Sequence, residues 1–393
     1  MTRKKITFAS PSRLRVSSIE PTMPDSPTIL FAGGGTGGHL YPGISVAQAL
    51  LKLNPNIKPL FLTTTKEIDK VILGPTGFEY IPQPIVPPVK TIGGLLKFWK
   101  SWRETKDIVK RTIKDRRPAA VLGLGGYAAG VAVKEGAQRG LKAAIINPDV
   151  IPGKANQYLL QYVDTVCCGF AETAGHVEAK HQGKLRVTGC PIRTEILAMP
   201  PRDEAIARLG LERKFSTLVV TGASLGAKTI NEAILTMLKD VTLRGWQILH
   251  LSGREHVDSV RAGYRELEQP ARILDFTPAM ADVWAVADIA ISRSGASSCA
   301  ELTACGVPSI LLPYPYHKDM HQRANAQVLA DAGAAILIDD DKDRRKSADK
   351  LRPALESLLF DGNRRKAMAD AARSIGKPNA ADEVAAALMV MIG

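Results

Sequence analysis

The chain of 393 residues has few aromatic residues, few cysteines and no long apolar segment. Only 5% of its residues are aromatic and no RNA- or DNA-binding motif occurs, so we expect no nucleic-acid partner. Five cysteines without C-x-x-C spacing argue against a disulfide framework or structural zinc site, and favour a reducing cytoplasm. No apolar run reaches the roughly 18–20 residues that span a bilayer. The net charge of +13 then indicates a nucleotide or an anionic lipid as the partner.

Residues 1–26 are basic and lack an apolar core of the signal-peptide type. We interpret them as a disordered basic extension. The remaining length suits about two domains of ordinary size.

A glycine-rich turn stands near the start of this remainder. Residues 28–39 read TILFAGGGTGGH, and apolar residues then recur at helical spacing from Ile44 to Leu51. The pattern predicts a strand, a tight turn and a helix N-terminus, which together can hold a phosphate. His39, at the mouth of the turn, adds a side chain that can transfer protons.

The same pattern returns at residues 217–227, which read TLVVTGASLGA. Strands separated by helices predict parallel, doubly wound sheets. We therefore predict an α/β protein of two Rossmann-like domains facing across a cleft, 27–192 and 193–393, with the last helix packing back on the first domain. Further strands are predicted at 57–62, 120–124, 143–146, 165–168, 185–187, 247–251, 272–274, 289–292, 309–312 and 335–338.

Two other classes of protein share parts of this pattern. The turn at 33–38 fits the dinucleotide fingerprint, but the second predicted strand does not end in the acidic residue that an NAD site needs. The sequence GASLG at 222–226 fits the nucleophile elbow of serine hydrolases, with Asp288 and His317 in triad order. A hydrolase leaves the first glycine turn unexplained, so we favour Ser224 as a hydrogen-bond donor to a phosphate.

A third group of small and polar residues spans 292–301, which reads SRSGASSCAE. Glu301, in an early turn of the helix, can bridge two ribose hydroxyls, or it can respond to the helix dipole. His317 and His321 are four residues apart but have no third ligand, so we predict no metal site. We interpret the three aspartates at 339–341 as a solvated charge run and not as a metal-binding D-x-D motif.

The stretch 93–103 mixes apolar and aromatic residues with cations. This composition suits contact with an anionic membrane surface, although core positions with cations extending outward would read the same. The expected membrane contacts are Leu95, Leu96, Phe98, Trp99 and Trp102.

Several motifs in order carry a family resemblance that covers about residues 28–385. They are GGTGGHLYPG at 34–43, LGLGGY at 122–127, GCPIR at 189–193, TGASLGA at 221–227, RSGA to Glu301 from 293, and HKD at 317–319 with Gln322 and Asn325. Together they resemble the MurG family, the UDP-N-acetylglucosamine–undecaprenyl-diphospho-muramoylpentapeptide N-acetylglucosaminyltransferases, which have the GT-B fold.

The resemblance implies an inverting, metal-independent transfer of N-acetylglucosamine from UDP-GlcNAc, without a cofactor, to a polyprenyl-diphosphate-linked acceptor. In that family the reaction converts lipid I to lipid II for peptidoglycan, at the cytoplasmic face of the bacterial inner membrane, with the enzyme bound peripherally. His39 would be the general base that takes the proton from the acceptor hydroxyl.

The resemblance also assigns binding residues. Thr36, Gly37 and Gly38 would lie at the acceptor diphosphate and the reacting centre. Ser224 and Arg193 would contact the donor diphosphate, the backbone at Thr277 the uracil, and Glu301 the ribose. The wall close to the donor would be Ala296, Ser297, Ser298, Cys299 and Ala300, and the sugar would meet Gln322 and Asp149.

The sequence departs from the family at positions where sugar and acceptor would meet. The family's His-Glu-Gln-Asn corresponds to residues 146–149, INPD, which puts Asp149 in place of an Asn that contacts the sugar. The Gln-Gln pair becomes His321 and Gln322. Three alternatives stay open: another GT-B lipid glycosyltransferase such as a diacylglycerol glycosyltransferase, a serine hydrolase, and a non-catalytic nucleotide-sugar-binding protein.

Overall fold

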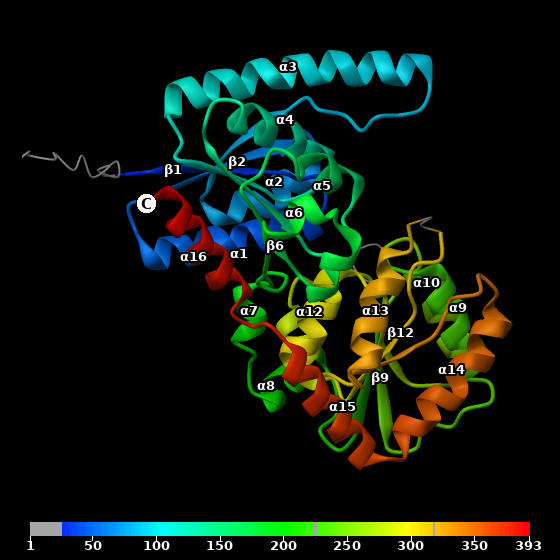
Figure 1. Cartoon of the computed structure of the whole chain (residues 1–393). Coiled ribbons are helices and arrows are strands. Elements are labelled where there is room, and N and C mark those ends of the chain that lie inside the picture. The colour runs from blue at the N-terminus through cyan, green and yellow to red at the C-terminus, as the bar shows by residue number, and fades with distance from the viewer. Residues whose placement is uncertain (1–25, 223–225, 317–318) are drawn as a thin grey trace, which may run out of the picture.

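The computed structural model describes residues 26–222, 226–316 and 319–393, and it contains two α/β units (Figure 1). The basic extension predicted at 1–26 lies outside these residues, apart from Ser26. The first unit contains β1 (Thr28–Ala32), β2 (Lys58–Thr64), β3 (Glu79–Gln83), β4 (Ala120–Gly123), β5 (Lys142–Asn147), β6 (Thr165–Cys168) and β7 (Leu185–Val187). The second contains β8 (Ser216–Thr221), β9 (Trp246–Leu251), β10 (Ala271–Leu274), β11 (Ile289–Ser292), β12 (Ser309–Leu311) and β13 (Ala335–Leu337).

Each unit is built on one parallel sheet. The strand orders are β3-β2-β1-β4-β5-β6-β7 and β10-β9-β8-β11-β12-β13. The order reverses between β1 and β4, and again between β8 and β11. These are the switch points at which doubly wound sheets bind their ligands. The predicted pair of Rossmann-like units is confirmed.

Helices cover both faces of the two sheets. In the first unit and the connection they are α1 (Gly37–Leu53), α2 (Glu67–Leu73), η1 (Gly74–Thr76), α3 (Ile92–Arg116), α4 (Gly126–Ala137), α5 (Lys154–Leu159), η2 (Ala171–His176), α6 (Ala179–Gln182), α7 (Thr194–Leu197) and α8 (Arg202–Leu209). The others are α9 (Lys228–Met237), α10 (Val257–Glu266), α11 (Met280–Val286), α12 (Ala296–Cys305), α13 (His321–Asp331), α14 (Arg344–Leu359), α15 (Gly362–Ile375) and α16 (Ala380–Ile392).

Most strands were predictable because a parallel strand is buried on both faces and reads as a continuous apolar run. Every residue of β1 and β4, for example, is buried. Strand β3 was missed because it lies at the edge of the sheet, is largely unburied and contains Pro82. An edge strand tolerates a proline because one side of its backbone has no strand to pair with.

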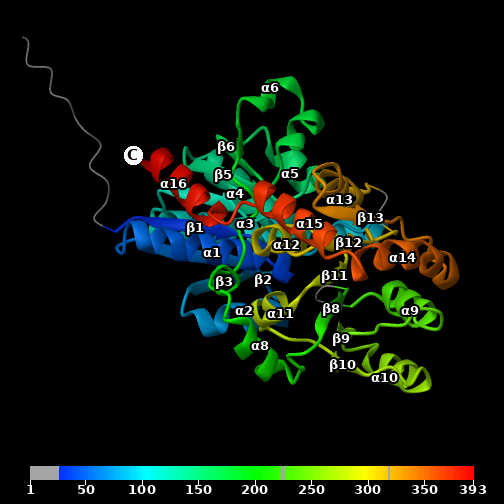
Figure 2. The ribbon, with the colours of Figure 1, turned by 90° about the horizontal axis from the view of Figure 1, so that it is seen from below.

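The chain crosses between the units twice. It leaves the first unit after β7 and returns between α15 and α16, and α16 then lies beside α1 in both views (Figures 1 and 2). Val384, Ala385 and Leu388 of α16 belong to the same apolar cluster as β1 and α1. The two crossings touch at Gly189, where a Cβ atom would fall 2.3 Å from Cβ of Lys377.

A fully buried histidine joins α9 and α10 to strand β9 of the second sheet. His250 Nε2 donates to Oδ1 of Asn231 at 3.0 Å, and Nδ1 accepts from the Tyr264 hydroxyl at 2.9 Å. The Asn231 side-chain amide in turn donates to the Ser252 carbonyl at 3.0 Å. Burial lowers the pKa of His250 from its ordinary 6.5 to about 3, because the interior penalises the charged ring.

This histidine predicts a dependence of stability on pH. Between pH 6.5 and 3 the unfolded chain binds a proton at His250 that the folded chain does not, so its contribution to stability is lost as the pH falls. The free energy of unfolding, measured in urea, should fall between pH 7 and pH 5 by about 2 kcal/mol less in His250→Gln than in the parent chain. Exposed His176→Gln is the control; equal losses in parent and His250→Gln would contradict the assignment.

Candidate active site

The first glycine turn joins β1 to α1 at the switch point of the first sheet. Gly35 has φ +83°, a left-handed conformation that favours glycine, and Thr36 is the extended N-cap of α1. Thr36 and Gly38 are exposed and Gly37 is half-buried, so the start of the helix is accessible. This geometry presents helix N-terminal amides outward, as an anion-binding turn requires.

His39 lies in the first turn of α1 with its ring on the backbone of a second glycine pair. A Cβ atom at Gly126 would fall 2.8 Å from Cε1 of His39, so residues 125 and 126 must be small. His39 Nδ1 lies 3.1 Å from the Gly34 carbonyl and 3.3 Å from Thr36 Oγ1. Because a carbonyl only accepts, Nδ1 carries the hydrogen and Nε2 keeps its lone pair in the neutral ring. Burial lowers the pKa of His39, which favours that neutral form near pH 7.

Asp69 of α2 was not singled out from the sequence, yet it holds the glycine turn in place. Its carboxylate accepts from Gly35 N at 2.6 Å, from Thr64 N at 2.8 Å and from Thr64 Oγ1 at 2.6 Å. Only 1% of Asp69 is exposed. The sequence signal was weak, because an aspartate in a mixed helix is ordinarily solvated.

Arg193, at the first crossing, contacts both units. Its guanidinium lies 4.9 Å from the centre of the Tyr41 ring on α1, and Nη2 lies 3.3 Å from Glu301 Oε1 on α12. Glu301 Oε2 also accepts from Trp284 Nε1 at 2.8 Å. Burial raises the pKa of Glu301, while Arg193 and Trp284 act in the opposite direction. The expected diphosphate and ribose contacts therefore lie together.

The other predicted donor contacts surround this pair. Arg193 Nη1 donates to the carbonyl of Pro278, next to Thr277, at 3.2 Å. Gln322 reaches Gly295, the N-cap of α12, and its Oε1 accepts from Tyr314 N at 3.0 Å. The first turn of α12 contains Ala296, Ser297, Ser298 and Cys299, followed by Ala300.

The Cys299 side chain is 1% exposed and packs in an apolar cluster of the second unit, so it faces the core and not a ligand. Ser224 falls outside the described residues, as does His317.

Asp149, predicted near the sugar, contacts the second unit. Its Oδ1 accepts from Asn325 Nδ2 on α13 at 2.7 Å, and Asn325 Oδ1 accepts from Val150 N at 2.9 Å. Asn325 Nδ2 also donates to the Ser294 carbonyl at 3.1 Å. Asp149 follows β5 and Ser294 follows β11, so these bonds join the carboxyl edges of the two sheets.

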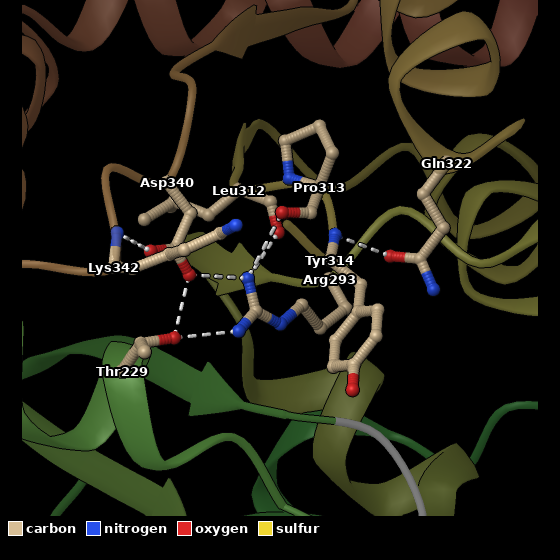
Figure 3. A network of polar contacts seen from close by, with 8 residues as sticks. All are labelled: Thr229, Arg293, Leu312, Pro313, Tyr314, Gln322, Asp340 and Lys342. Atoms are coloured by element: carbon tan, nitrogen blue, oxygen red, sulfur yellow. Dashed lines mark hydrogen bonds and ion pairs between the residues drawn. The ribbon is translucent and has the colours of Figure 1, made fainter. Parts of the chain in front are cut away.

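A buried ion pair joins the loops at the carboxyl edge of the second sheet (Figure 3). Arg293 Nη1 lies 2.8 Å from Asp340 Oδ2, and Thr229 Oγ1 contacts both side chains. The same Nη1 donates to the carbonyls of Leu312 and Pro313. The interpretation of 339–341 as a solvated run is wrong for Asp340, whose side chain has no exposed surface because it neutralises Arg293.

The serine-hydrolase hypothesis fails at Asp288. This residue precedes β11 and accepts from Thr217 N at 2.7 Å and Arg202 Nη2 at 2.6 Å. Thr217 and Asp288 both lie at the amino end of the sheet, whereas the GASLG turn follows the carboxyl end of β8. Along β8, Thr217 and Thr221 are about 13 Å apart at 3.3 Å per residue, so the Asp288 carboxylate, bonded to Thr217 N, lies at the opposite end of this strand from Gly222.

Helix α3 forms the outer face of the first unit, on the side away from the second (Figure 1). Leu95, Leu96 and Trp99 are 44%, 68% and 63% exposed. Phe98 and Trp102 differ from the expectation, because both are only half-exposed and pack on the core of the first unit, Trp102 against Gly130. Ile92, which was not predicted, is 84% exposed. Among the helices of the described ranges, none is long and apolar enough to cross a membrane.

Comparison with known proteins first defines the class. Residues 29–168 match the glycosyltransferase family 28 N-terminal domain, and residues 217–384 match its C-terminal domain. The crystal structure of Acinetobacter baumannii MurG has a TM-score of 0.73 and 24% identity, covering 93% of this chain and 99% of that one. The class is therefore that of two-domain family 28 glycosyltransferases.

Relatives then identify the family. The UDP-N-acetylglucosamine–N-acetylmuramyl-(pentapeptide) pyrophosphoryl-undecaprenol N-acetylglucosamine transferase of Halothermothrix orenii is 33% identical over 362 residues, 89% of this chain and 95% of that protein. The protein of the same name from Desulfitobacterium hafniense is 32% identical over 369 residues, 91% of this chain and 97% of its own length. The chain belongs to this family, the MurG family, and the predicted resemblance is confirmed.

The buried ion pair of Arg293 and Asp340 predicts that substitutions of Asp340 and its neighbour Asp339 will lower stability by different amounts. Asp340→Ala leaves Arg293 buried without a counter-charge and should cost about 3–5 kcal/mol of unfolding free energy. Asp339, whose exposed side chain pairs with Arg323, is the matched control, and Asp339→Ala should cost about 0–1 kcal/mol. Denaturant unfolding of both variants measures the difference; similar losses would contradict the role of Asp340.

Proposed function

We propose that the protein transfers N-acetylglucosamine from UDP-GlcNAc to a polyprenyl-diphosphate-linked muramoyl-pentapeptide, with inversion at the anomeric carbon. Relatives of about 30% identity over about nine-tenths of the chain are named for this reaction. The observation that carries the proposal is the neutral His39 beside the accessible start of α1, with Nδ1 bonded to the Gly34 carbonyl and the lone pair left on Nε2.

In this reaction His39 acts as the general base. Nε2 takes the proton of the acceptor hydroxyl as its oxygen attacks the anomeric carbon, and the bond from that carbon to the UDP oxygen breaks. UDP leaves with the bonding electrons, so a single displacement converts an α-linked donor to a β-linked product. An imidazole whose pKa is lowered by burial is unprotonated at neutral pH and suits this task.

The departing diphosphate needs positive charge on the second unit. Arg193 pairs with Glu301 of α12, and its guanidinium and the N-terminus of that helix can both stabilise a diphosphate without a metal ion. Glu301 would bind the ribose hydroxyls and residues 276–278 the base. We propose that the reaction needs neither a metal nor a cofactor.

We further propose that α3 places the protein on the cytoplasmic face of the inner membrane. The exposed apolar side chains of Ile92, Leu95, Leu96 and Trp99 lie among Lys97, Lys100 and Arg103 on the same helix. Apolar groups surrounded by cations favour an interface with anionic lipid. The lipid-linked acceptor would then reach the first unit from the membrane.

The reaction is tested with UDP-GlcNAc and a lipid I analogue, using diacylglycerol as the comparison acceptor. The parent chain should form the β-linked disaccharide product from the lipid I analogue. His39→Ala should lower kcat by about 10²–10⁴-fold, because the proton acceptor is lost. Affinity for UDP, measured by calorimetry, should stay near that of the parent.

Transfer to diacylglycerol alone would move the protein to another class of lipid glycosyltransferase. Loss of UDP binding with unchanged turnover in His39→Ala would remove His39 from the base role.

Membrane contact is tested on the exposed side chains of α3. Leu96→Ser with Trp99→Ser should weaken partitioning onto vesicles that contain anionic phospholipid, because apolar surface buried in the interface is lost. Sedimentation with vesicles measures the effect. Exposed Phe360→Ser on the second unit is the control, and unchanged partitioning of the α3 variant would contradict the proposal.

A further inference from the structure

One peptide group in the glycine turn is hydrogen-bonded on both sides. The N–H of Gly35 donates to Asp69 Oδ1 at 2.6 Å. The C=O of Gly34, which belongs to the same peptide group, accepts from His39 Nδ1 at 3.1 Å. A single planar amide therefore separates a buried carboxylate from the imidazole.

The carboxylate of Asp69 has only neutral partners in the described part of the chain. Its second oxygen accepts from Thr64 N at 2.8 Å and Thr64 Oγ1 at 2.6 Å, and no ion pair of these residues includes Asp69. The negative charge of a buried carboxylate without an ion pair is not neutralised, so it acts strongly on the neighbouring dipoles. At Oδ1 of Asp69 the neighbouring dipole is the Gly34–Gly35 amide.

We propose that Asp69 is a positioning residue that sets the tautomer and basicity of His39 through the Gly34–Gly35 peptide group. The inference rests on the proposed role of His39 as general base. A carboxylate that accepts from an N–H polarises the amide, and the carbonyl at its other end becomes a stronger acceptor. The strengthened carbonyl holds the hydrogen on Nδ1, so Nε2 is left to receive the substrate proton.

The glycines of the turn are required by this arrangement. A Cβ atom at Gly34 would fall 2.4 Å from Oδ2 of Asp69, inside any allowed contact. A side chain at residue 34 would therefore push the carboxylate away from the amide. Glycine at residue 34 therefore makes room for the Asp69 carboxylate, in addition to the close approach of a ligand that glycines in such a turn allow.

Three charged groups influence the pKa of His39, and their signs predict how this pKa changes when Asp69 is replaced. Asp69 and Asp149, both in the first unit, raise the pKa of the imidazole, whereas Lys66 lowers it. Removing the negative charge of Asp69 should therefore lower the pKa of His39. The acid limb of kcat, which requires unprotonated His39, should move to lower pH.

The variant Asp69→Asn separates this role from a structural one. An Asn side chain can accept from Gly35 N, but its amide then faces the donor at Thr64 N, so a bond in the turn is lost as well as the charge. Thr64→Val is the matched control, because it removes one bond to Asp69 and keeps the charge. Long-range ¹⁵N spectra of the imidazoles follow the tautomer and pKa of His39 without any need for turnover, and the His39→Gln spectrum assigns the signal.

We expect His39 of the parent chain to be the Nδ1–H tautomer. We expect Asp69→Asn to lower the pKa of His39 and to move the acid limb of kcat to lower pH. The value of kcat falls about tenfold, part of what a general base supplies, and KM for UDP-GlcNAc stays within about twofold. Thr64→Val keeps the pKa of His39 and the position of the acid limb.

An Nε2–H tautomer in the parent chain would overturn the proposal even if Asp69→Asn did not fold. An unchanged pKa of His39 in a folded Asp69→Asn would overturn it too. A chain that shows the NMR effects but no transfer with any lipid acceptor would contradict the proposed function and leave the coupling of Asp69 to His39 established.

Discussion

The side chain of Asn325 bonds the two units to each other. It is fully buried, donates to Asp149 and to the Ser294 carbonyl, and accepts from Val150 N. A buried amide with its hydrogen bonds satisfied has one favoured geometry, since any shift leaves polar groups unpaired. The carboxyl edges of two sheets, each a ready ligand site, are thereby held in register. In the proposed reaction, this register would let His39 and Arg193 act on the same pair of substrates.

The charges of the site are divided between the units. The first unit supplies a neutral imidazole and the buried Asp69, and the second supplies Glu301, with Arg193 at the crossing between them. Each buried charge is either paired or bonded to several donors, as desolvation demands. In the proposed reaction, His39 of the first unit would accept the proton and Arg193 at the crossing would stabilise the departing diphosphate.

The sequence predicted the sheets well because buried parallel strands are apolar throughout, and their glycine turns mark the carboxyl ends. The family resemblance also implied that Arg193, Glu301 and Gln322 share one donor site, and in the structure all three lie around α12. Pair contacts between distant segments were not predictable. Asp340 looks like any surface aspartate until its neighbour Arg293 is placed by a different strand, and Asp69 looks solvated until the glycine turn folds over it. Phe98 and Trp102 were expected to contact the membrane but pack on the core, because helical spacing alone does not show which face of α3 lies against α4.

The contact between Gly189 and Lys377 gives the molecule a mechanical property. The two passages of the backbone between the units touch at these residues, so the covalent connections lie at one place and not at two separated places. A change in the angle between the units would use backbone torsions at this place, and it would also have to break the bonds of Asn325. Residue 189 is a glycine, which can adopt φ +86° and which has no Cβ atom to keep the two passages apart. A small rotation about this place would change the separation of the two units most at the points of the facing edges that lie farthest from it.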